Sequence, residues 1–209
     1  MKKKKVLVVL GGTSKERAIS LASGKACIKA IKKIGYTVKS FDPLKNFFNQ
    51  IDKANIDIIF NALHGKDGED GMAQSYFEYL RIPYTHSGVL SSMNAMDKAS
   101  SKNIFLKNKI LTPKYFLLQL DYFKQNKLNL LIKRNKLFFP LVVKPVNEGS
   151  SIGVKICKNY KSLLSSIYNL RKNYKELIVE QFIGGQEVQV AVFKNKGLGA
   201  IELKPKRVF

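Results

Sequence analysis

The stretch that decides the fold is residues 4–24, KKVLVVLGGTSKERAISLASG. Its first part is an unbroken apolar run, 6–10, that stops at two glycines. A short apolar run that ends in a glycine loop is typical of a buried parallel strand. Small and apolar residues then recur at helical spacing, at Ile19, Ala22, Ser23, Ala26 and Ala30, and predict a helix to about Ile34. Strand, tight loop and helix in this order favour a doubly wound α/β unit.

Two more strands are expected after this helix, at 36–41 and 56–61, and a further helix over 88–109. We therefore predict a parallel-sheet, Rossmann-like domain over residues 1–98. The polar, lysine-rich segment 119–137 receives no assignment.

The pattern changes character after about residue 138, where strands follow one another with fewer helices between them. We expect strands at 139–145, 154–157, 177–180, 187–192 and 198–204, a helix at 160–174, and a hairpin turn at Asn195-Lys196-Gly197. This order predicts a second, α+β domain over residues 99–209.

The net charge of +22 raises the possibility of a nucleic-acid-binding module. However, the 37 basic residues comprise 32 lysines and only 5 arginines, and they are spread along the whole chain. Proteins that read base edges depend on arginine for its planar, bidentate guanidinium. A solvated lysine-rich surface is therefore the interpretation we favour.

The two cysteines, Cys27 and Cys157, are 130 positions apart and belong to no metal-binding pattern. We expect both to be reduced and buried in a cytoplasmic protein. The apolar run after the basic start, 6–10, is too short for a signal peptide, and no run is long enough to span a membrane.

Two glycine-containing loops in the first half of the chain could bind a ligand. Residues 11–14 precede a helix, and their N–H groups could hold an anion or a carboxylate. Glu16 has two interpretations: it has capping-box spacing with Thr13, or it binds a substrate ammonium group. The second loop, His64 to Gly71, has three glycines among eight residues and could either cover a polar ligand or form routine Asp-Gly turns.

A third loop, Glu148-Gly-Ser-Ser-Ile-Gly153, lies between two predicted strands with Lys144 shortly before it. Glycines and small hydroxyl residues let backbone N–H groups surround phosphate oxygens, although an ordinary glycine hairpin has the same composition. Glu180 and Glu187 come at the ends of predicted strands, where carboxylates can accept hydrogen bonds from ribose hydroxyls or simply face solvent.

Five segments in order make a specific combination, although each is weak by itself. They are GGTSKERAISLASG (11–24), ALHGKDGEDG (62–71), SGVLSSMNAMDK (87–98), VKPVNEGSSIGV (143–154) and VEQFIGGQEV (179–188). Together they resemble the D-alanine–D-alanine ligases, which are ATP-grasp enzymes. The resemblance covers the whole chain and implies a pre-ATP-grasp parallel-sheet domain followed by a partial ATP-grasp domain, with subdomains at about 112–182 and 183–209.

The resemblance also implies roles for individual residues. Glu16 and Ser150 correspond to catalytic residues, with the Glu16 carboxylate on the ammonium of the first D-alanine, and His64 lies near the substrates. The residues implied to bind ATP are Lys98, Lys144, Glu148, Ser150, Ser151, Glu180, Gln181, Phe182, Ile183, Glu187 and Phe209. Gln181 departs from the family, which often has lysine there.

In the family the chain continues for about another third, which carries the ligands of Mg²⁺ or Mn²⁺. We therefore expect the chain of 209 residues to be inactive alone, with no metal ligands of its own. The implied function is ATP-dependent synthesis of D-alanyl-D-alanine for peptidoglycan, by a cytoplasmic homodimer that binds neither nucleic acid nor membrane. One alternative is an ATP-grasp ligase with a different acceptor, such as D-lactate or D-serine. The other is a basic nucleic-acid-binding module, which belongs to a different class of protein.

Overall fold

The computed structural model describes residues 4–44 and 48–204. The chain divides into two compact units: residues 1–108 with 146–150, and residues 109–145 with 151–209. Helix α4 (Lys98–Lys107) belongs to the first unit. The domain division after residue 98 stays a prediction.

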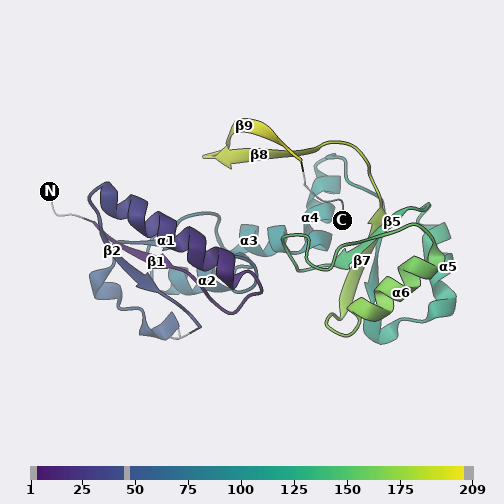
Figure 1. The fold of residues 1–209 in the computed structure, drawn as a ribbon, viewed down its shortest axis with the longest axis horizontal. Helices are drawn as coiled ribbons and strands as arrows, with labels where there is room; N and C mark the ends of the chain where they lie inside the picture. Colours follow the sequence, from purple (N-terminus) through teal and green to yellow (C-terminus); the bar gives the residue numbers. More distant parts are fainter. Residues whose placement is uncertain (1–3, 45–47, 205–209) are drawn as a thin grey trace. The chain divides into compact units, whose positions relative to one another are not determined.

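The first unit is built on a parallel sheet of three strands (Figure 1). β1 (Lys5–Val9) lies in the centre, and β2 (Thr37–Phe41) and β3 (Ile58–Asn61) pair with it in parallel on either side. This confirms the parallel-sheet fold class predicted for the amino-terminal part. Because β1 is central and covered on both faces, its side chains are apolar at every position from Val6 onward.

Two helices cover the two faces of this sheet. Helix α1 (Arg17–Lys33) packs Leu21, Ile28 and Ile31 against the alternate β1 residues Val6 and Val8. Helix α2 (Met72–Tyr79) packs on the face formed by Leu7 and Val9. Short 3-10 turns at Phe48–Gln50 and Lys53–Asn55 precede β3.

The single helix predicted over 88–109 is wrong. The segment forms two helices, α3 (Val89–Met96) and α4, which are separated at Asp97. Asp97 has an extended backbone, and its carboxylate accepts a hydrogen bond from the Ser100 N–H at 2.7 Å. Aspartate at this position stabilises the start of a new helix more than it supports continuation of the old one.

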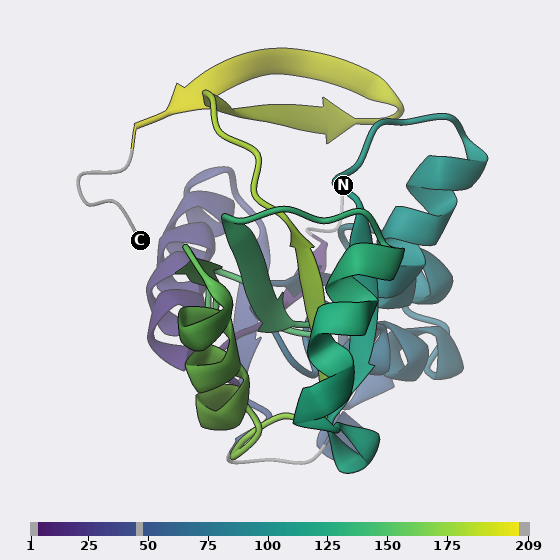
Figure 2. The same cartoon turned by 90° about the vertical axis from the view of Figure 1, so that its right-hand side faces the viewer.

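The second unit contains an antiparallel sheet in the order β4-β7-β5-β6 (Figure 2). Its strands are β4 (Tyr115–Gln119), β5 (Leu141–Pro145), β6 (Lys155–Cys157) and β7 (Glu176–Gln181). Helices α5 (Gln125–Arg134) and α6 (Tyr160–Leu170) pack on one face, where Leu141, Val143, Leu177 and Val179 meet Leu128, Ile132, Leu163 and Ile167. The unassigned segment 119–137 thus forms a 3-10 turn, Leu120–Tyr122, and helix α5.

Two further strands, β8 (Glu187–Phe193) and β9 (Lys196–Leu203), form a hairpin. The turn lies at Lys194 and Asn195, both at positive φ, and so one residue earlier than the sequence predicted. All side chains of the hairpin are exposed, including Val190 at 54% and Ile201 at 61%.

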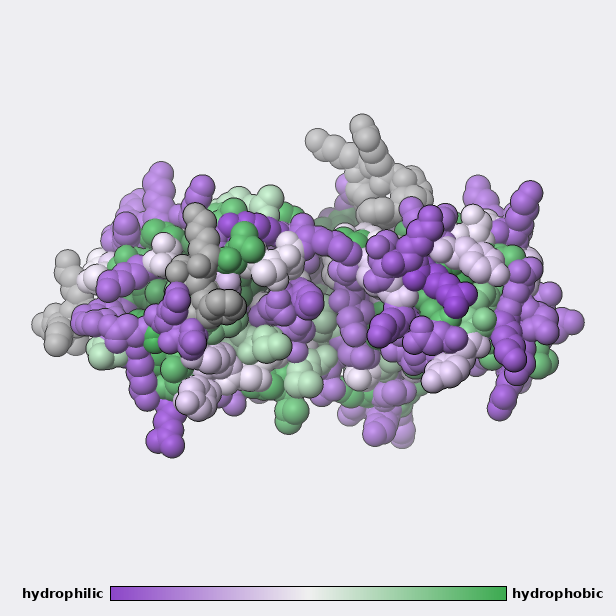
Figure 3. All heavy atoms as spheres, turned by 90° about the horizontal axis from the view of Figure 1, so that it is seen from below, coloured by the Kyte–Doolittle hydropathy of each residue, from purple (hydrophilic) through white to green (hydrophobic). Residues whose placement is uncertain are grey.

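Strongly hydrophilic side chains are spread over the face drawn in Figure 3 and do not gather into one block. Among the residues that the structure describes, no helix is long and apolar enough to cross a membrane. Cys157 is buried as expected, whereas Cys27 is only half-buried, and both are free thiols.

An ion pair fixes the loop between β1 and α1. Arg17 Nη2 lies 2.7 Å from Asp42 Oδ2, and Arg17 Nη1 donates to the Gly12 carbonyl at 2.9 Å. The Gly12 N–H in turn donates to Asp42 Oδ1 at 3.1 Å. The hydrogen bonds from Arg17 lower the pKa of Asp42 to about 2, and backbone N–H groups of Gly12 and Leu44 contribute, although burial opposes them.

We expect Asp42→Asn to destabilise the first unit by about 1 kcal/mol, the value for charged hydrogen bonds near solvent. Because the folded pKa of about 2 lies below the ordinary value of about 3.9, Asp42 contributes stability that is complete above about pH 4 and is lost as pH falls towards 2. Urea unfolding followed by circular dichroism at pH 7 and pH 3 measures both effects.

The matched control is Asp52→Asn, at an exposed carboxylate that accepts a hydrogen bond from the Ala54 N–H. An asparagine oxygen can keep that bond, so the control should change stability much less. An equal loss in the two variants would contradict a special role for the Arg17–Asp42 pair.

Candidate functional site

Glu16 is the centre of a polar cluster in the first unit. It stands at the N-cap of α1, directly after the glycine loop, and is 8% exposed. The Ser150 hydroxyl donates a hydrogen bond to Glu16 Oε1, although the two residues are 134 positions apart. A buried carboxylate with one hydroxyl partner retains further acceptor capacity for a cationic group.

The capping-box interpretation of Glu16 is wrong. Thr13 Oγ1 donates to Asp67 Oδ2 at 2.8 Å and does not cap the helix, and Glu16 makes no side-chain cap. The Glu16 N–H donates to Ser14 Oγ at 3.1 Å instead. The carboxylate of Glu16 therefore belongs to the polar cluster and is not used in capping α1.

Two N–H groups of the loop 11–14 already have partners within the first unit. The Gly11 N–H donates to Ser20 Oγ at 2.8 Å, and the Gly12 N–H donates to Asp42 Oδ1. Two of the N–H groups are thus used within the unit itself. Gly11 and Gly12 have φ values of +85° and +75°, so the turn depends on glycine.

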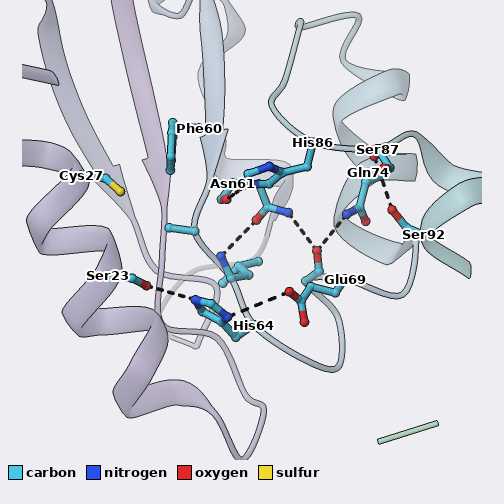
Figure 4. A pocket seen from close by; sticks show the side chains of 13 residues that line it. Ser23, Cys27, Phe60, Asn61, His64, Glu69, Gln74, His86, Ser87 and Ser92 are labelled. Atoms are coloured by element: carbon cyan, nitrogen blue, oxygen red, sulfur yellow. Dashed lines mark hydrogen bonds and ion pairs between the residues drawn. The ribbon is translucent and has the colours of Figure 1, made fainter. Parts of the chain in front are cut away.

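His64 lies on the loop that follows β3, at the same edge of the sheet as Glu16. Its carbonyl accepts from Ser14 Oγ at 2.6 Å. Its ring lies between Ser23 and Glu69, as Figure 4 shows, with Nε2 3.1 Å from Ser23 Oγ. Because β1 and β3 are parallel, the loops after them meet at one edge of the sheet.

The segment 146–150 brings further charges to the first unit. Lys98 Nζ donates to the Val146 carbonyl at 3.2 Å and also to the Glu148 carbonyl. The Glu148 carboxylate lies 2.6 Å from Lys15 Nζ. Lys98 and Glu148 therefore make contacts within the unit that hold the loop carrying Ser150.

The second unit contains a largely buried ion pair between Lys144 of β5 and Glu180 of β7. In the sheet register Lys144 lies opposite Ile178, and Glu180 lies opposite Val142, so the two charges are diagonal neighbours on one face. That face is the one opposite α5 and α6. The side chains are 20% and 8% exposed. Glu180 is thus not the exposed strand-end acid that was the simpler alternative.

The segment after Glu180 leaves the sheet at a fixed position. The side chain of Gln181 donates to the carbonyls of Phe138 and Pro140 at 2.9 and 3.2 Å, and the Phe182 N–H donates to the Pro140 carbonyl at 3.3 Å. Ile183 is 65% exposed. The Gln181 side chain therefore contributes to the structure by holding the end of β7 against the segment 138–140.

Two other predicted residues, Glu187 and Ser151, are not brought into these clusters. Glu187 is exposed at the start of β8, and Ser151 is exposed with φ +58°. Phe209 lies outside the described residues.

Within residues 4–44 and 48–204, no group of three or more histidine, cysteine, aspartate or glutamate side chains could hold a metal ion. The described residues by themselves therefore do not fit a Mg²⁺ or Mn²⁺ site.

Sequence reasoning missed several residues around His64. Ser23 follows Glu16 by seven positions and so lies on the same side of α1, which was a usable signal. Asn61 and Gln74 carried no usable signal in the sequence, because each acts through a contact with the backbone. Their side-chain amides donate hydrogen bonds to the Gly68 carbonyl at 2.8 Å each.

Two family profiles match the chain: "D-ala D-ala ligase N-terminus" over residues 39–87 and "D-ala D-ala ligase C-terminus" over residues 104–208. The D-alanine–D-alanine ligase of Pelagibacter ubique is 52% identical over 99% of this chain, and that of Fervidobacterium nodosum is 38% identical over 97%. The chain spans 66% and 67% of the lengths of these two relatives.

Solved structures give the same result. The D-alanine–D-alanine ligase from Bacillus anthracis complexed with ATP superimposes with a TM-score of 0.85, at 35% identity, over 99% of this chain and 68% of the other. The enzyme from Vibrio cholerae, at 24% identity and a TM-score of 0.83, shows the same fold. Fold and clusters thus define an α/β protein of the ATP-grasp ligase class. The chain belongs to the D-alanine–D-alanine ligase family.

We expect Gly65→Ala to disturb the Glu16 cluster. Gly65 has φ +69°, and a Cβ atom there would lie 2.6 Å from Glu16 Oε2. Gly35→Ala is the matched control, because Gly35 has φ +95° but nothing within 4 Å of a Cβ atom. Both variants bear the cost of a left-handed alanine, about 1–2 kcal/mol, and Gly65→Ala should lose about 1 kcal/mol more through the clash.

Urea unfolding of the two variants measures this difference. Equal stability would show that the loop moves away from Glu16 without cost, and would contradict the tight arrangement of the cluster.

We expect Lys144→Met to destabilise the second unit by about 3 kcal/mol, because it leaves the Glu180 carboxylate buried without its cation. The double variant Lys144→Met/Glu180→Gln removes both charges and should recover part of the loss. Thermal unfolding of the two single variants and the double variant measures the coupling. Strictly additive losses would show that the pair contributes nothing as a pair.

Proposed function

We propose that this chain forms the D-alanine- and ATP-binding part of an enzyme that joins two D-alanine molecules with ATP. The single observation that carries this proposal is the Glu16–Ser150 hydrogen bond, which brings together two residues that the family resemblance assigns to the site. Family membership and the ATP complex of the Bacillus anthracis relative support the choice of substrates.

In the first unit, Glu16 would bind the ammonium group of the first D-alanine. Its carboxylate is 8% exposed and is oriented by the Ser150 hydroxyl, so an ion pair there is shielded from water and stronger than a surface pair. His64 would contact the same substrate. Ser14 connects these two residues, since its hydroxyl lies 2.6 Å from the His64 carbonyl and 3.1 Å from the Glu16 N–H.

In the second unit, Lys144 would place its ammonium on the ATP phosphates, and Glu180 would hold that lysine in position. The segment Gln181–Ile183 would border the adenine, and Glu187 the ribose. The family resemblance also implies ATP contacts for Lys98, Glu148, Ser150 and Ser151. These residue types fit a nucleotide, because cations face phosphates and a backbone segment at a strand end can hydrogen-bond a base.

The proposed reaction has two steps. The carboxylate of one D-alanine takes the γ-phosphoryl group of ATP, which gives an acyl phosphate and ADP. The amine of the second D-alanine then attacks the acyl carbon, and phosphate leaves. The chain's own residues supply position and charge in both steps and form no covalent bond to substrate.

We further propose that the working enzyme is a cytoplasmic homodimer that acts in peptidoglycan precursor synthesis and binds neither nucleic acid nor membrane. D-Alanine is the proposed acceptor, because the named relatives are all D-alanine–D-alanine ligases. Product analysis with competing D-lactate and D-serine tests this choice.

The test is a chimera in which residues 1–209 are continued by the last third of the Pelagibacter ubique ligase. We expect it to form D-alanyl-D-alanine from ATP and D-alanine, whereas the chain of 209 residues alone gives no product. In the chimera, Glu16→Gln should raise the KM for D-alanine by about 30-fold or more, because a buried ion pair to the substrate is lost.

Glu78→Gln is the matched control, since Glu78 is an exposed carboxylate that accepts a hydrogen bond from the Tyr84 hydroxyl. It should leave the KM unchanged. Product formation by the 209-residue chain alone would overturn the expectation that the further third is needed. A chimera that is folded and binds ATP but makes no dipeptide would overturn the proposed reaction.

A further inference from the structure

The His64 ring borders a cavity of about 390 Å³ inside the first unit (Figure 4). The same cavity is lined by Ser23 of α1, Glu69 of the loop after β3, and Gln74 of α2. A side chain that faces open space on one side is not held there by packing. The orientation of the His64 ring therefore depends on the polar contacts of its two nitrogens.

The nitrogen Nε2 lies 3.1 Å from Ser23 Oγ, and which of the two groups donates depends on the tautomer of the ring. Ser23 Oγ also lies 2.9 Å from the Ile19 carbonyl, one helical turn earlier. The hydroxyl has a single proton, and a proton that stays hydrogen-bonded to the Ile19 carbonyl is not available to the ring. Ser23 Oγ is then left to accept, and His64 donates to it from Nε2–H.

The nitrogen Nδ1 has a looser contact. It lies 4.0 Å from Glu69 Oε1, which is too far for a hydrogen bond. The other carboxylate oxygen of Glu69 accepts from the Gly65 N–H at 2.8 Å, so the carboxylate is held by its own loop. When Nε2 carries the proton, a neutral His64 keeps a lone pair on Nδ1, beside an anionic oxygen.

The loop itself is anchored from both sides of the cavity. The Gly68 carbonyl accepts from the side-chain amides of Asn61 and Gln74 at 2.8 Å each. The backbone between His64 and Glu69 is thus fixed by the end of β3 and by α2. The ring of His64 is the part of this loop whose orientation Ser23 decides.

We propose that Ser23 is a positioning residue for His64: it holds the ring through Nε2 and selects the tautomer in which Nδ1 remains an acceptor. The pair formed by His64 Nδ1 and Glu69 Oε1 then offers two acceptors to an N–H donor, such as the amine of an amino acid. Only the binding of the amine rests on the proposed function. The ring orientation and the tautomer do not.

The chain contains two histidines, which makes the tautomer directly measurable. In the ¹⁵N-histidine-labelled 209-residue chain, long-range ¹H–¹⁵N spectra show just two rings, and His64→Gln assigns them. His86 is an internal reference, because its Nε2 lies 2.9 Å from the Asn61 carbonyl oxygen and must donate to it. Spectra are recorded at about pH 8.5, because an imidazole with the ordinary pKa of about 6.5 is neutral there.

We expect both rings to show the Nε2–H pattern. In Ser23→Ala the two ring-nitrogen shifts of His64 should move toward each other, as in a mixture of tautomers, while His86 stays unchanged. Ser23→Thr keeps the hydroxyl and should restore the original pattern. Ser75→Ala is the matched control, because the Ser75 hydroxyl also donates to a carbonyl four residues earlier, that of Gly71 at 2.7 Å, and has no histidine partner in these contacts.

Two results would overturn the proposal: a parent spectrum with the His64 proton on Nδ1, or a folded Ser23→Ala chain with an unchanged His64 pattern. The parent spectrum decides the first point even if a variant does not fold.

The chimera described above separates this proposal from the proposed function. There, Ser23→Ala should raise the KM for D-alanine about tenfold with little change in kcat, and Ser23→Thr should reverse it. A changed His64 spectrum with an unchanged KM would leave Ser23 as the residue that positions the ring, and would overturn the contact between His64 and D-alanine.

Discussion

Parallel pairing of β1 with β3 is the constraint on which the candidate site depends. It directs the carboxyl ends of both strands to one edge of the sheet, so the loop that carries Glu16 and the loop that carries His64 start side by side. The turn after β1 can be tight only because Gly11 and Gly12 adopt positive φ. The hydrogen bonds of Ser14 then join the two loops, from the His64 carbonyl to the Glu16 N–H.

Each unit contains an ion pair that holds the surrounding backbone in place. Asp42 is paired with Arg17 and fixes the glycine loop, and Glu180 is paired with Lys144 across two strands. An unpaired charge at either buried position would be costly, so each pair restricts the local backbone to one arrangement. The proposed ligand-binding residues Glu16 and Lys144 are thus set in position before any substrate arrives, which favours catalysis by orientation.

The parts of the fold with strong local patterns were predicted well. The apolar run of β1, the helical spacing of α1 and the apolar run of β7 each carry their signal in a few neighbouring residues. The break at Asp97 was missed because helical periodicity continues across it, and only the hydrogen bond to the Ser100 N–H distinguishes a cap from a residue within a helix. The capping box at Thr13 failed for a related reason, since a tertiary partner, Asp67, takes the Thr13 hydroxyl.

The sequence by itself determined the α/β class and the family, because these follow from the order of strands, helices and ligase motifs along the chain. It also identified Glu16, Ser150, His64 and Lys144 as candidates through that resemblance. Only the tertiary structure decided which groups meet: Ser150 with Glu16, Lys144 with Glu180, and Ser23 with His64. A hydrogen bond depends on distances of a few tenths of an ångström between groups that the sequence places up to 134 positions apart, and folding alone sets those distances.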